Sequence, residues 1–342
     1  MSELKNIHFI IPDFTQFISG GNLYNQELMN AMQQYSTISI HQWTIEEFSK
    51  QYQNIEKGLF IVDTLYLDEM KDLLRLKKKG QKFHLLVHHL ESLYPPKGHS
   101  SKDWFIEKER PLLLPYDGYI VTSEYTANYL RRHKMKKTII VIPPAVLFIP
   151  KRVPLRKSKP IKALLAANVI ERKGILPLLK ILANQLIDPK DFSLEIAGDL
   201  TMEKDYANTC LQLVQDTPLR SYCRFLGPLS PKAIQKKYKQ SNLLIATSFF
   251  ETYGMTLQEG VVWKLPILAI KGGNTAYHVQ NGLNGYLLDS IEDLVVRLNS
   301  LIMNQEWMEL LLKQIAQTNN KESYTWKDAA KKLEGISEGA LN

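Results

Sequence analysis

The chain has 342 residues, of which 44% are hydrophobic and 23% are charged, and its formal net charge is +8. This composition is ordinary for a globular protein and excludes a disordered chain, a collagen-like fibre and a coiled coil. The length favours about two domains, each large enough to bury a core of its own.

Short apolar runs alternate with helical stretches along the first part of the chain. The candidate strands are Ile7–Ile11, Leu59–Val62, Phe83–Val87, Tyr119–Thr122 and Ile139–Ile142. Between them lie stretches with helical periodicity, namely Asn22–Met32, Leu67–Lys78 and Glu124–Arg132. Strands that alternate with helices in this way predict βαβ units and a parallel sheet.

The alternation breaks at Pro143-Pro144, and the following segment has the composition of a linker. Residues 150–160 hold three prolines among several lysines and arginines. A second series of strands follows at Lys162–Ala167, Phe192–Ala197, Tyr222–Phe225, Leu243–Ala246, Ile267–Ile270 and Gly285–Leu288. Its helices begin near Lys173, Glu203, Pro231, Met255 and Ile291, and further helices follow residue 303. We therefore expect two parallel-sheet domains, divided at residues 150 and 151.

Open α/β sheets bind ligands beyond the carboxyl ends of their strands, so two such domains predict a site in a cleft. This architecture alone is shared by dehydrogenases, epimerases, binding proteins and glycosyltransferases, and it does not decide between them. The chain contains no Asp-x-Asp, no Gly-x-Gly-x-x-Gly after the first strand and no P-loop motif. Dehydrogenase and P-loop functions are therefore disfavoured.

The most informative segment is residues 248–260, Ser-Phe-Phe-Glu-Thr-Tyr-Gly-Met-Thr-Leu-Gln-Glu-Gly, which follows a strand and opens a helix. Gly254 allows a sharp turn, and the amide groups after it would lie at the positive end of the helix dipole, where a diphosphate binds well. Glu251 and Glu259 flank the turn, and a carboxylate can accept two hydrogen bonds from a ribose or sugar diol. The pattern suits a nucleotide-sugar; solvated acids at a helix start remain the alternative.

The spacing of Glu251 and Glu259 resembles the Glu-x7-Glu motif of retaining family-4 glycosyltransferases, the glycosyl transferases group 1, which have the GT-B fold. The turn Tyr253-Gly254-Met255 resembles the family's Phe-Gly-Met turn. Residues 262–267 resemble its helix-to-strand exit, with Lys264 in place of a glycine. The pairs Gly272-Gly273 and Asn281-Gly282 match later loops, and the resemblance covers roughly residues 161–290.

Upstream, residues 167–174 resemble the family's strand-to-helix turn that ends in Lys-Gly. Lys173 at a helix start adds a full charge beside the helix dipole, which suits a departing diphosphate. Many members carry an arginine where this chain has Asn168, so either Arg172 supplies the second cation or it is a surface residue. Residues 194–199 fit the family's next strand and glycine turn, which places Gly198 near the donor.

The first half of the chain resembles the family more weakly. Ser19-Gly20-Gly21-Asn22 resembles its glycine-rich first loop, and Val87-His88-His89 ends a strand where the family often has a histidine. The alignment favours His88 over His89, with a structural histidine as the alternative. Tyr324-Thr325-Trp326 resembles the opening of a last helix that packs back onto the first domain.

The resemblance implies a GT-B fold of two Rossmann-like parallel-sheet domains that face a cleft. Residues 1–150 with the helix 324–342 would form the acceptor domain, and residues 151–323 would bind the nucleotide-sugar donor. The implied catalytic residues are Glu251, Lys173 and His88. The implied donor-binding residues are Gly20, Gly21, Asn168, Arg172, Lys173, Gly198, Tyr253, Gly254, Met255, Thr256, Leu257 and Glu259.

The implied activity is a metal-independent hexosyltransferase that moves a sugar from a nucleoside-diphosphate sugar to a hydroxyl of a carbohydrate or lipid-linked acceptor, with retention at the anomeric carbon. It would serve the synthesis of a cell-surface polysaccharide, glycolipid or other glycoconjugate. No metal and no cofactor are implied, because the nucleotide-sugar is itself a substrate. A same-fold epimerase or phosphorylase and a non-catalytic transferase-like binding subunit are the alternatives.

The positive charge is clustered at Lys77–Lys79, Arg131–Lys137, Lys151–Lys162 and Lys232–Lys239. Nucleic acid, an anionic membrane surface, an acidic substrate or simple solvation could each explain such runs. Beside the glycosyltransferase motifs we expect no nucleic acid, and we keep a peripheral contact at the inner membrane face as one alternative. No apolar run approaches the ~20 residues of a spanning helix, residues 1–11 lack a secretory apolar stretch, and two cysteines make no disulfide framework. We expect a reduced, cytoplasmic protein.

Overall fold

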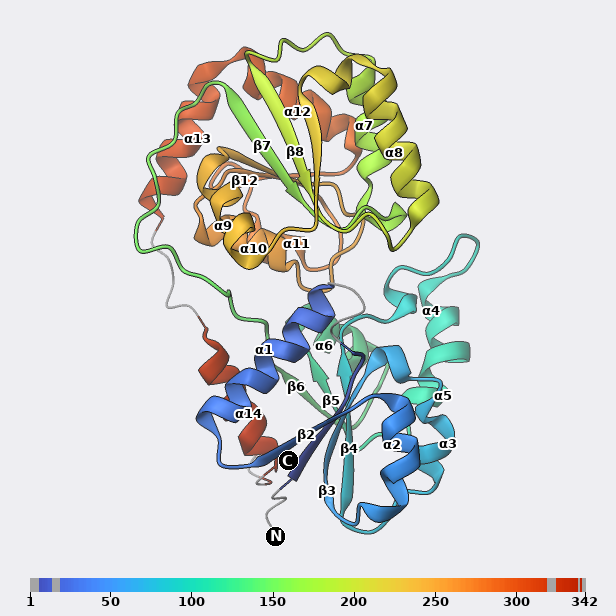
Figure 1. The fold of residues 1–342 in the computed structure, drawn as a ribbon. Coiled ribbons are helices and arrows are strands. Elements are labelled where there is room, and N and C mark those ends of the chain that lie inside the picture. The colour runs from blue at the N-terminus through green and yellow to red at the C-terminus, as the bar shows by residue number, and fades with distance from the viewer. Residues whose placement is uncertain (1–5, 14–18, 319–323, 338, 340–342) are drawn as a thin grey trace. The chain divides into compact units, whose positions relative to one another are not determined.

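The computed structural model describes residues 6–13, 19–318, 324–337 and 339. The chain forms two compact units, of which the first comprises residues 1–145 and 324–342 and the second residues 146–323 (Figure 1). Each unit is built on a six-stranded sheet in which every neighbouring pair of strands is parallel. The predicted α/β class with two Rossmann-like sheets is confirmed.

The first unit has the strand order β2-β1-β3-β4-β5-β6. Its strands are β1 (Asn6–Ile10), β2 (Ser39–Trp43), β3 (Gly58–Asp63), β4 (Gln81–Val87), β5 (Gly118–Val121) and β6 (Thr138–Val141). All six residues of β3 are buried, as expected of an apolar strand covered on both faces of a parallel sheet. Ile7 of β1 pairs with Leu59 of β3, and His84 of β4 pairs with Gly118 of β5.

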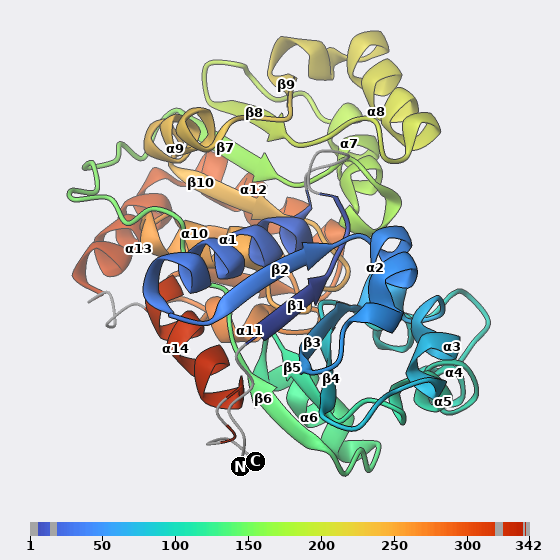
Figure 2. The ribbon, with the colours of Figure 1, turned by 60° about the horizontal axis from the view of Figure 1, so that its bottom comes forward.

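Helices cover both faces of this sheet. They are α1 (Gly20–Tyr35), α2 (Ile45–Gln51), α3 (Met70–Arg75), α4 (Ser101–Trp104), α5 (Arg110–Leu113), α6 (Glu124–Arg132) and α14 (Trp326–Ser337). Figures 1 and 2 show α1 and α14 on one face and α2 to α5 on the other. Single helical turns at 52–54, 64–66 and 91–93 and a π-helical turn at 105–109 complete the unit.

The C-terminal helix α14 returns to the first unit, as the sequence predicted. Ala329, Ala330 and Leu333 are fully buried in one core with Tyr24 and Leu28 of α1. The Ser36 hydroxyl, next to the end of α1, donates to Glu334 Oε1 at 2.7 Å. Of the predicted segment 324–342, residues 338 and 340–342 lie outside the described residues.

The second unit has the strand order β12-β11-β10-β7-β8-β9. Its strands are β7 (Ile161–Ala166), β8 (Phe192–Ala197), β9 (Cys223–Gly227), β10 (Leu243–Ala246), β11 (Ile267–Ile270) and β12 (Gly285–Leu288). Its helices are α7 (Ile175–Ala183), α8 (Lys204–Asp216), α9 (Pro231–Gln240), α10 (Met255–Val262), α11 (Thr275–His278), α12 (Ile291–Met303) and α13 (Gln305–Gln317). Short helical turns lie at 171–173 and 218–221. Residues of α7, α8 and α12 share one core and residues of α9 and α10 share another, so the sheet is covered on both faces.

The structure contains one strand that the sequence analysis did not predict. Strand β2, Ser-Ile-His-Gln-Trp, has no buried residue and pairs only with β1 at the edge of the sheet. An edge strand with polar residues lacks the apolar run by which buried parallel strands are recognised. The helix expected at Leu67–Lys78 is also shorter, because α3 covers only Met70–Arg75.

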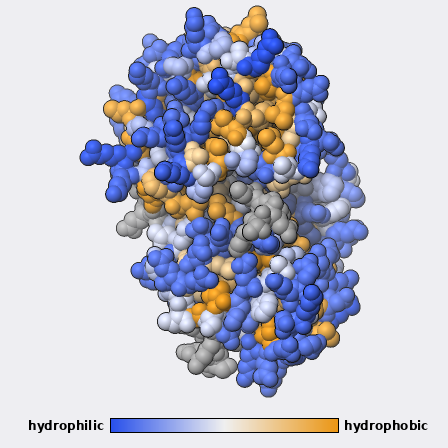
Figure 3. Space-filling model, viewed as in Figure 1, coloured by the Kyte–Doolittle hydropathy of each residue, from blue (hydrophilic) through white to orange (hydrophobic). Residues whose placement is uncertain are grey.

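Figure 3 shows a mostly hydrophilic surface with smaller hydrophobic areas. None of the helices in the described part of the chain is long and apolar enough to cross a membrane.

Candidate functional site

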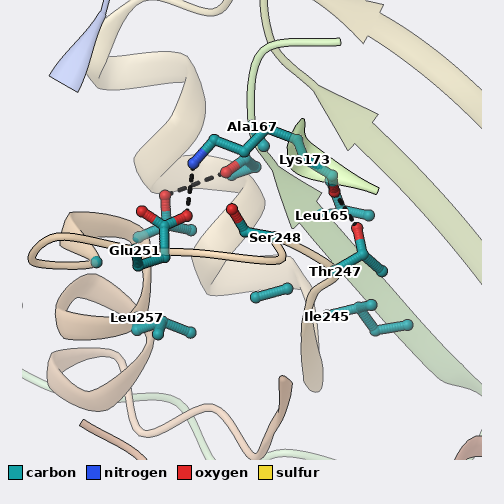
Figure 4. A pocket seen from close by; sticks show the side chains of 12 residues that line it. Leu165, Ala167, Lys173, Ile245, Thr247, Ser248, Glu251 and Leu257 are labelled. Carbon is teal, nitrogen blue, oxygen red and sulfur yellow. Dashed lines mark hydrogen bonds and ion pairs between the residues drawn. The ribbon is translucent and has the colours of Figure 1, made fainter. Parts of the chain in front are cut away.

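A hollow in the second unit opens at the carboxyl ends of β7 and β10, where parallel sheets of this type bind their ligands. It encloses about 300 Å³ of empty space, part of it open to solvent. Its walls come from the end of β7, the turn before α7, the loop after β10 and the start of α10 (Figure 4). The lining residues are Leu165, Ala166, Ala167, Lys173, Ile245, Ala246, Thr247, Ser248, Glu251, Gly254, Thr256 and Leu257.

Two predicted site residues, Lys173 and Glu251, meet in this hollow as an ion pair. Lys173 Nζ lies 2.5 Å from Glu251 Oε1, and the side chains are 17% and 19% exposed (Figure 4). Burial raises the pKa of the Glu251 carboxyl, but the Lys173 ammonium, with Arg172 and the Ser248 hydroxyl, outweighs burial and lowers it overall. Glu251 is therefore ionised at neutral pH. Lys173 has two further N–H bonds, and neither has a partner among the residues that the structure describes.

The backbone around Lys173 is held by the loop that follows β10. The Thr247 hydroxyl donates to the Lys173 carbonyl at 2.6 Å, and the Phe249 amide donates to the Arg172 carbonyl at 3.1 Å. Gly174 adopts φ +64°, and a Cβ atom there would lie 2.4 Å from the Thr247 carbonyl oxygen. Only glycine fits this close approach, which explains why a Lys-Gly pair opens α7.

Arg172 and Asn168 hold loops of this unit together. The Arg172 guanidinium donates from Nη1 to the Phe250 carbonyl at 2.8 Å. Asn168 Oδ1 accepts the Asp199 amide at 3.1 Å, and the Gly198 amide donates to the Gly227 carbonyl at 3.0 Å. Arg172 is therefore neither a solvated surface residue nor a lining residue of the hollow: its guanidinium anchors the backbone next to Glu251.

The first turn of α10 borders the hollow. Gly254 precedes the helix with φ +90°, and no side chain among the described residues caps the N-terminus. The Thr256 hydroxyl donates to the Ala166 carbonyl at 3.1 Å, which ties the start of α10 to the end of β7. Backbone amides of Met255, Thr256 and Leu257 at an uncapped helix start are suited to bind an anion.

Two side chains donate hydrogen bonds to the carbonyl of Tyr253, just before this turn. It accepts hydrogen bonds from His278 Nε2 at 2.7 Å and from Asn274 Nδ2 at 3.0 Å. Burial lowers the pKa of His278 to about 4, although the bond to Tyr253 and the charge of Glu251 oppose the shift. His278 is therefore neutral at pH 7.

The predicted loop Gly272-Gly273 positions the backbone of Glu251. Glu251 forms an isolated parallel bridge with Gly273, and its carbonyl accepts the Asn274 amide at 2.7 Å. A Cβ atom at Gly273 would lie 2.1 Å from the Glu251 carbonyl oxygen. The two glycines thus allow the two loops to touch.

Glu259, the second acid of the motif, lies further along α10 and does not line the hollow. Its Oε2 accepts the Tyr238 hydroxyl of α9 at 2.5 Å. Burial raises the pKa of Glu259, and the hydrogen bond from Tyr238 lowers it only in part. The structure therefore separates the two acids: one is paired with a cation, and the other is held by a phenol.

The first unit carries the other predicted residues. Gly20 and Gly21 open α1, and the His88 ring follows β4 and packs against Gly21. A Cβ atom at Gly21 would lie 3.3 Å from the His88 ring. His88 Nε2 lies 2.7 Å from Asn25 Oδ1 and 3.5 Å from Asp63 Oδ2.

Residues 149–321 match the model of the family described as glycosyl transferases group 1, which is just over half of the chain. The chain belongs to this family. The matched residues include Lys173, Glu251 and Glu259, so the hollow lies within the matched part of the chain. The inferred resemblance to the glycosyl transferases group 1 is therefore confirmed.

Curated relatives carry related names. A probable sucrose-phosphate synthase from Thermosipho melanesiensis is 25% identical over 66% of this chain and 55% of its own length. A D-inositol 3-phosphate glycosyltransferase from Corynebacterium kroppenstedtii is 24% identical over 38% of this chain and 29% of its own length. A sucrose synthase from Melioribacter roseus is 27% identical over 38% of this chain and 18% of its own length. The chain thus spans less than two thirds of each of these relatives.

Solved structures share the fold over almost the whole chain. A sucrose-phosphate synthase from Thermosynechococcus elongatus superposes with a TM-score of 0.75 at 17% identity, covering 98% of both chains. Anabaena HepE, solved in complex with UDP and glucose, superposes with a TM-score of 0.69 at 15% identity, covering 98% of this chain and 99% of that one. At such identities the likeness establishes the fold, and it confirms the GT-B prediction.

Sequence reasoning missed the residues that hold the predicted ones in place. These are Tyr238, His278, Asn274, Thr247, Asn25 and Asp63. Only Asp63 offered a signal, because it is an acid at the end of a buried apolar strand. The others are ordinary helix and loop residues whose partners lie far away in the sequence.

Proposed function

We propose that the protein is a retaining glycosyltransferase that moves a sugar from a nucleoside-diphosphate sugar to an acceptor hydroxyl. The observation that supports this most directly is the Lys173–Glu251 pair beside the uncapped start of α10, within the stretch that the family model matches. A cation, a row of backbone amides and a carboxylate in one hollow are the groups that a diphosphate joined to a sugar requires.

In this proposal each residue has one task. The ammonium of Lys173 and the amides of Met255, Thr256 and Leu257 bind the diphosphate and stabilise the charge that grows on it as it leaves. Glu251 accepts hydrogen bonds from hydroxyls of the donor sugar. That Glu259 holds the ribose remains a prediction from the sequence, because Glu259 does not line the hollow and its Oε2 accepts the Tyr238 hydroxyl. Arg172 acts on the site by holding the Phe250 carbonyl. The contributions of Gly20, Gly21 and His88, in the first unit, and of Asn168 and Gly198 remain predictions from the sequence.

The reaction breaks the bond between the anomeric carbon and the diphosphate oxygen, and the electron pair stays on the diphosphate. The acceptor oxygen attacks the anomeric carbon on the same face, and its proton passes to the departing phosphate oxygen. The configuration is therefore retained, and no step of this scheme needs a metal ion. The ion pair with Lys173 keeps Glu251 ionised but partly neutralised, so we assign Glu251 to binding rather than to nucleophilic attack.

We place the reaction in the synthesis of a cell-surface polysaccharide, glycolipid or other glycoconjugate, with the acceptor bound by the first unit. A peripheral contact with anionic lipid is a separate proposal, which depends on exposed cations such as Lys79, Lys136 and Lys137. Lys77 is already paired with Asp117 at 2.5 Å. Equal sedimentation with anionic and neutral liposomes would exclude this contact.

The central test is donor binding and turnover. We would screen UDP, GDP and ADP sugars by thermal shift and then measure turnover of the stabilising donor in Lys173→Ala and Glu259→Ala. Loss of one charged contact should remove about 2–4 kcal/mol of transition-state stabilisation, or roughly 30- to 1000-fold in kcat/KM. Lys271→Ala is the matched control, because Lys271 is 67% exposed and lies 3.8 Å from Asp289 at the surface.

Wild-type turnover in both site variants would contradict the assignment of the site. Products formed without an acceptor, or only with inorganic phosphate, would instead indicate an epimerase or a phosphorylase. NMR of the product reports the anomeric configuration, and an inverted product would overturn the retaining mechanism.

A further inference from the structure

Three polar side chains of the first unit form a buried hydrogen-bonded chain. Asp63 is the last residue of β3, Asn25 lies in α1, and His88 follows β4. Asn25 is fully buried, Asp63 is 1% exposed, and the His88 side chain is 14% exposed. These three side chains thus connect the end of β3 to the imidazole of His88, which is partly accessible.

The orientation of the Asn25 amide follows from its contact with Asp63. Asp63 Oδ1 accepts the Leu65 amide at 2.9 Å, and Oδ2 lies 2.7 Å from Asn25 Nδ2. A carboxylate can only accept hydrogen bonds, so the NH₂ group of Asn25 must face Asp63. The amide oxygen of Asn25 then faces His88.

The same contacts determine which nitrogen of His88 carries the proton. Nε2 lies 2.7 Å from Asn25 Oδ1 and 3.5 Å from Asp63 Oδ2, and both of these atoms are acceptors. Nε2 must therefore donate, and in a neutral ring Nδ1 keeps its lone pair. Burial lowers the pKa of His88, and the charge of Asp63 raises it only in part, so the ring is neutral at pH 7.

The ring itself is held in one orientation. The edge of the ring lies near Tyr24, with the two ring centres 5.2 Å apart, and Tyr24 donates from its hydroxyl to the Ile142 carbonyl at 2.9 Å. Gly21 approaches the ring closely, since a Cβ atom there would lie 3.3 Å from the Cδ2 and Cγ atoms of His88. No hydrogen bond to Nδ1 comes from any residue in the described ranges.

We propose that Asp63 and Asn25 are positioning residues that fix His88 as its Nε2–H tautomer, so that Nδ1 accepts a hydrogen bond from a hydroxyl of the acceptor, which the first unit binds in the proposed function. A neutral imidazole nitrogen with a lone pair attracts an O–H group and repels a phosphoryl oxygen. His88 therefore binds carbohydrate and not the diphosphate. The identity of the bound hydroxyl rests on the proposed glycosyl transfer. The assignment of the tautomer does not.

The tautomer can be measured in the wild-type protein without any substrate. Uniform ¹⁵N labelling of histidine, with His88→Gln to assign the signal, distinguishes a protonated from an unprotonated ring nitrogen. We expect a protonated Nε2 and an unprotonated Nδ1 at pH 7. The opposite tautomer, or a mixture of the two, would overturn the inference.

Asp63→Asn should invert the tautomer. The side-chain oxygen of the new asparagine would still accept the Leu65 amide, so its NH₂ group would face Asn25. The Asn25 side-chain amide would then turn and donate to His88 Nε2. Nδ1 would then carry the proton and could no longer accept a substrate hydroxyl. We expect kcat/KM to fall by about 10- to 100-fold, with nucleotide affinity unchanged.

Asp117→Asn is the control, because Asp117 also binds a backbone amide and a side chain of this unit but does not touch His88. It should leave the tautomer and turnover as in wild type. A folded Asp63→Asn protein with the inverted tautomer and full turnover would refute the role of Nδ1. A wild-type protein without transfer activity toward any nucleotide-sugar would refute the proposed function, while the NMR result would still decide the tautomer.

Discussion

At the scale of single residues, the position of the proposed catalytic ammonium depends on a neighbour that has no side chain. Gly174 combines a positive φ with a close approach to the Thr247 carbonyl, and the same loop carries Glu251 at its far end. Any side chain at this position must push the turn that bears Lys173 away from the loop. The Lys-Gly pair is therefore a requirement of packing as much as of chemistry.

Gly174→Ala should destabilise the second unit by more than the roughly 1–2 kcal/mol of backbone strain alone, because strain and a steric clash add. It should also weaken nucleotide binding, since Lys173 and Glu251 would separate. Gly282→Ala is a suitable control, because Gly282 has φ +77° but no atom near the position of a Cβ. Urea unfolding and nucleotide titration of the two variants would test this, and equal losses would contradict it.

The lowered pKa of His278 lets us predict how folding stability depends on pH. Burial lowers its pKa to about 4 in the folded chain, against 6.5 for an ordinary histidine. Between these values the unfolded chain binds more protons, so stability is present at neutral pH and falls as the pH drops from about 6.5 toward 4. A shift of this size corresponds to roughly 3 kcal/mol.

His278→Gln should remove part of this dependence, because glutamine can still donate to the Tyr253 carbonyl but does not titrate. The measurement is the free energy of unfolding in urea between pH 4.5 and 7.5. His8 and His84, whose pKa values burial also lowers to about 4, leave a remaining slope in both proteins. An unchanged slope in the variant would show that His278 is not the titrating group.

At the scale of elements, one side chain of the linker joins two helices of the second unit. The Arg156 guanidinium donates to the Trp263 carbonyl at the end of α10 at 2.8 Å and to the Tyr238 carbonyl of α9 at 3.1 Å. It also donates to the Ser241 carbonyl. Burial lowers the pKa of Arg156 to about 10, so it remains a cation at the negative ends of both helices.

Arg156→Met should keep the volume but leave these buried carbonyls without a donor, which costs about 2–4 kcal/mol of folding stability. Because α9 also carries the Tyr238 hydroxyl that donates to Glu259, nucleotide affinity should fall together with folding stability. Arg152→Met at an exposed position of the same linker is the control. Equal midpoints of urea unfolding for the two variants would refute a stabilising role for Arg156.

The departure of Lys264 from the family's glycine also has its explanation at this scale. Lys264 follows α10 with φ +50°, a conformation that favours glycine. Its ammonium donates to the Ala316 and Thr318 carbonyls at the end of α13, at 2.9 Å each. These two hydrogen bonds stabilise a lysine at a turn position with positive φ.

At the scale of the whole molecule, the first unit is assembled from both ends of the chain. Helix α14 completes the core on α1, with Leu333 fully buried and the Trp326 ring 5.5 Å from that of Tyr24. The core of the first unit therefore includes residues of α14. We therefore expect a substitution in this core to destabilise the first unit and not the second.

Leu333→Ala should destabilise the first unit by about 2–5 kcal/mol, because it leaves a cavity in the core between α1 and α14. Amide exchange should accelerate in β1, β3 and β4 and stay unchanged in β7, β8 and β10. Lys332→Ala, on the exposed side of the same helix, should change neither. Accelerated exchange in both units would show that they unfold together.

The sequence by itself determined the class of fold and the positions of the motifs. Buried parallel strands such as β10 and β11 are continuous apolar runs, and a Lys-Gly pair and two glutamates eight positions apart are visible without coordinates. Strand β2 was not predicted, because an edge strand is not required to be apolar.

Only the tertiary structure decided which side chains meet. Lys173 and Glu251 are 78 positions apart, His88 and Asn25 are 63 apart, and Tyr238 and Glu259 are 21 apart. Such contacts depend on the order of strands in each sheet and on the helices packed over them. Local periodicity carries no information about either, because it reflects the burial of each segment and not the identity of its neighbour.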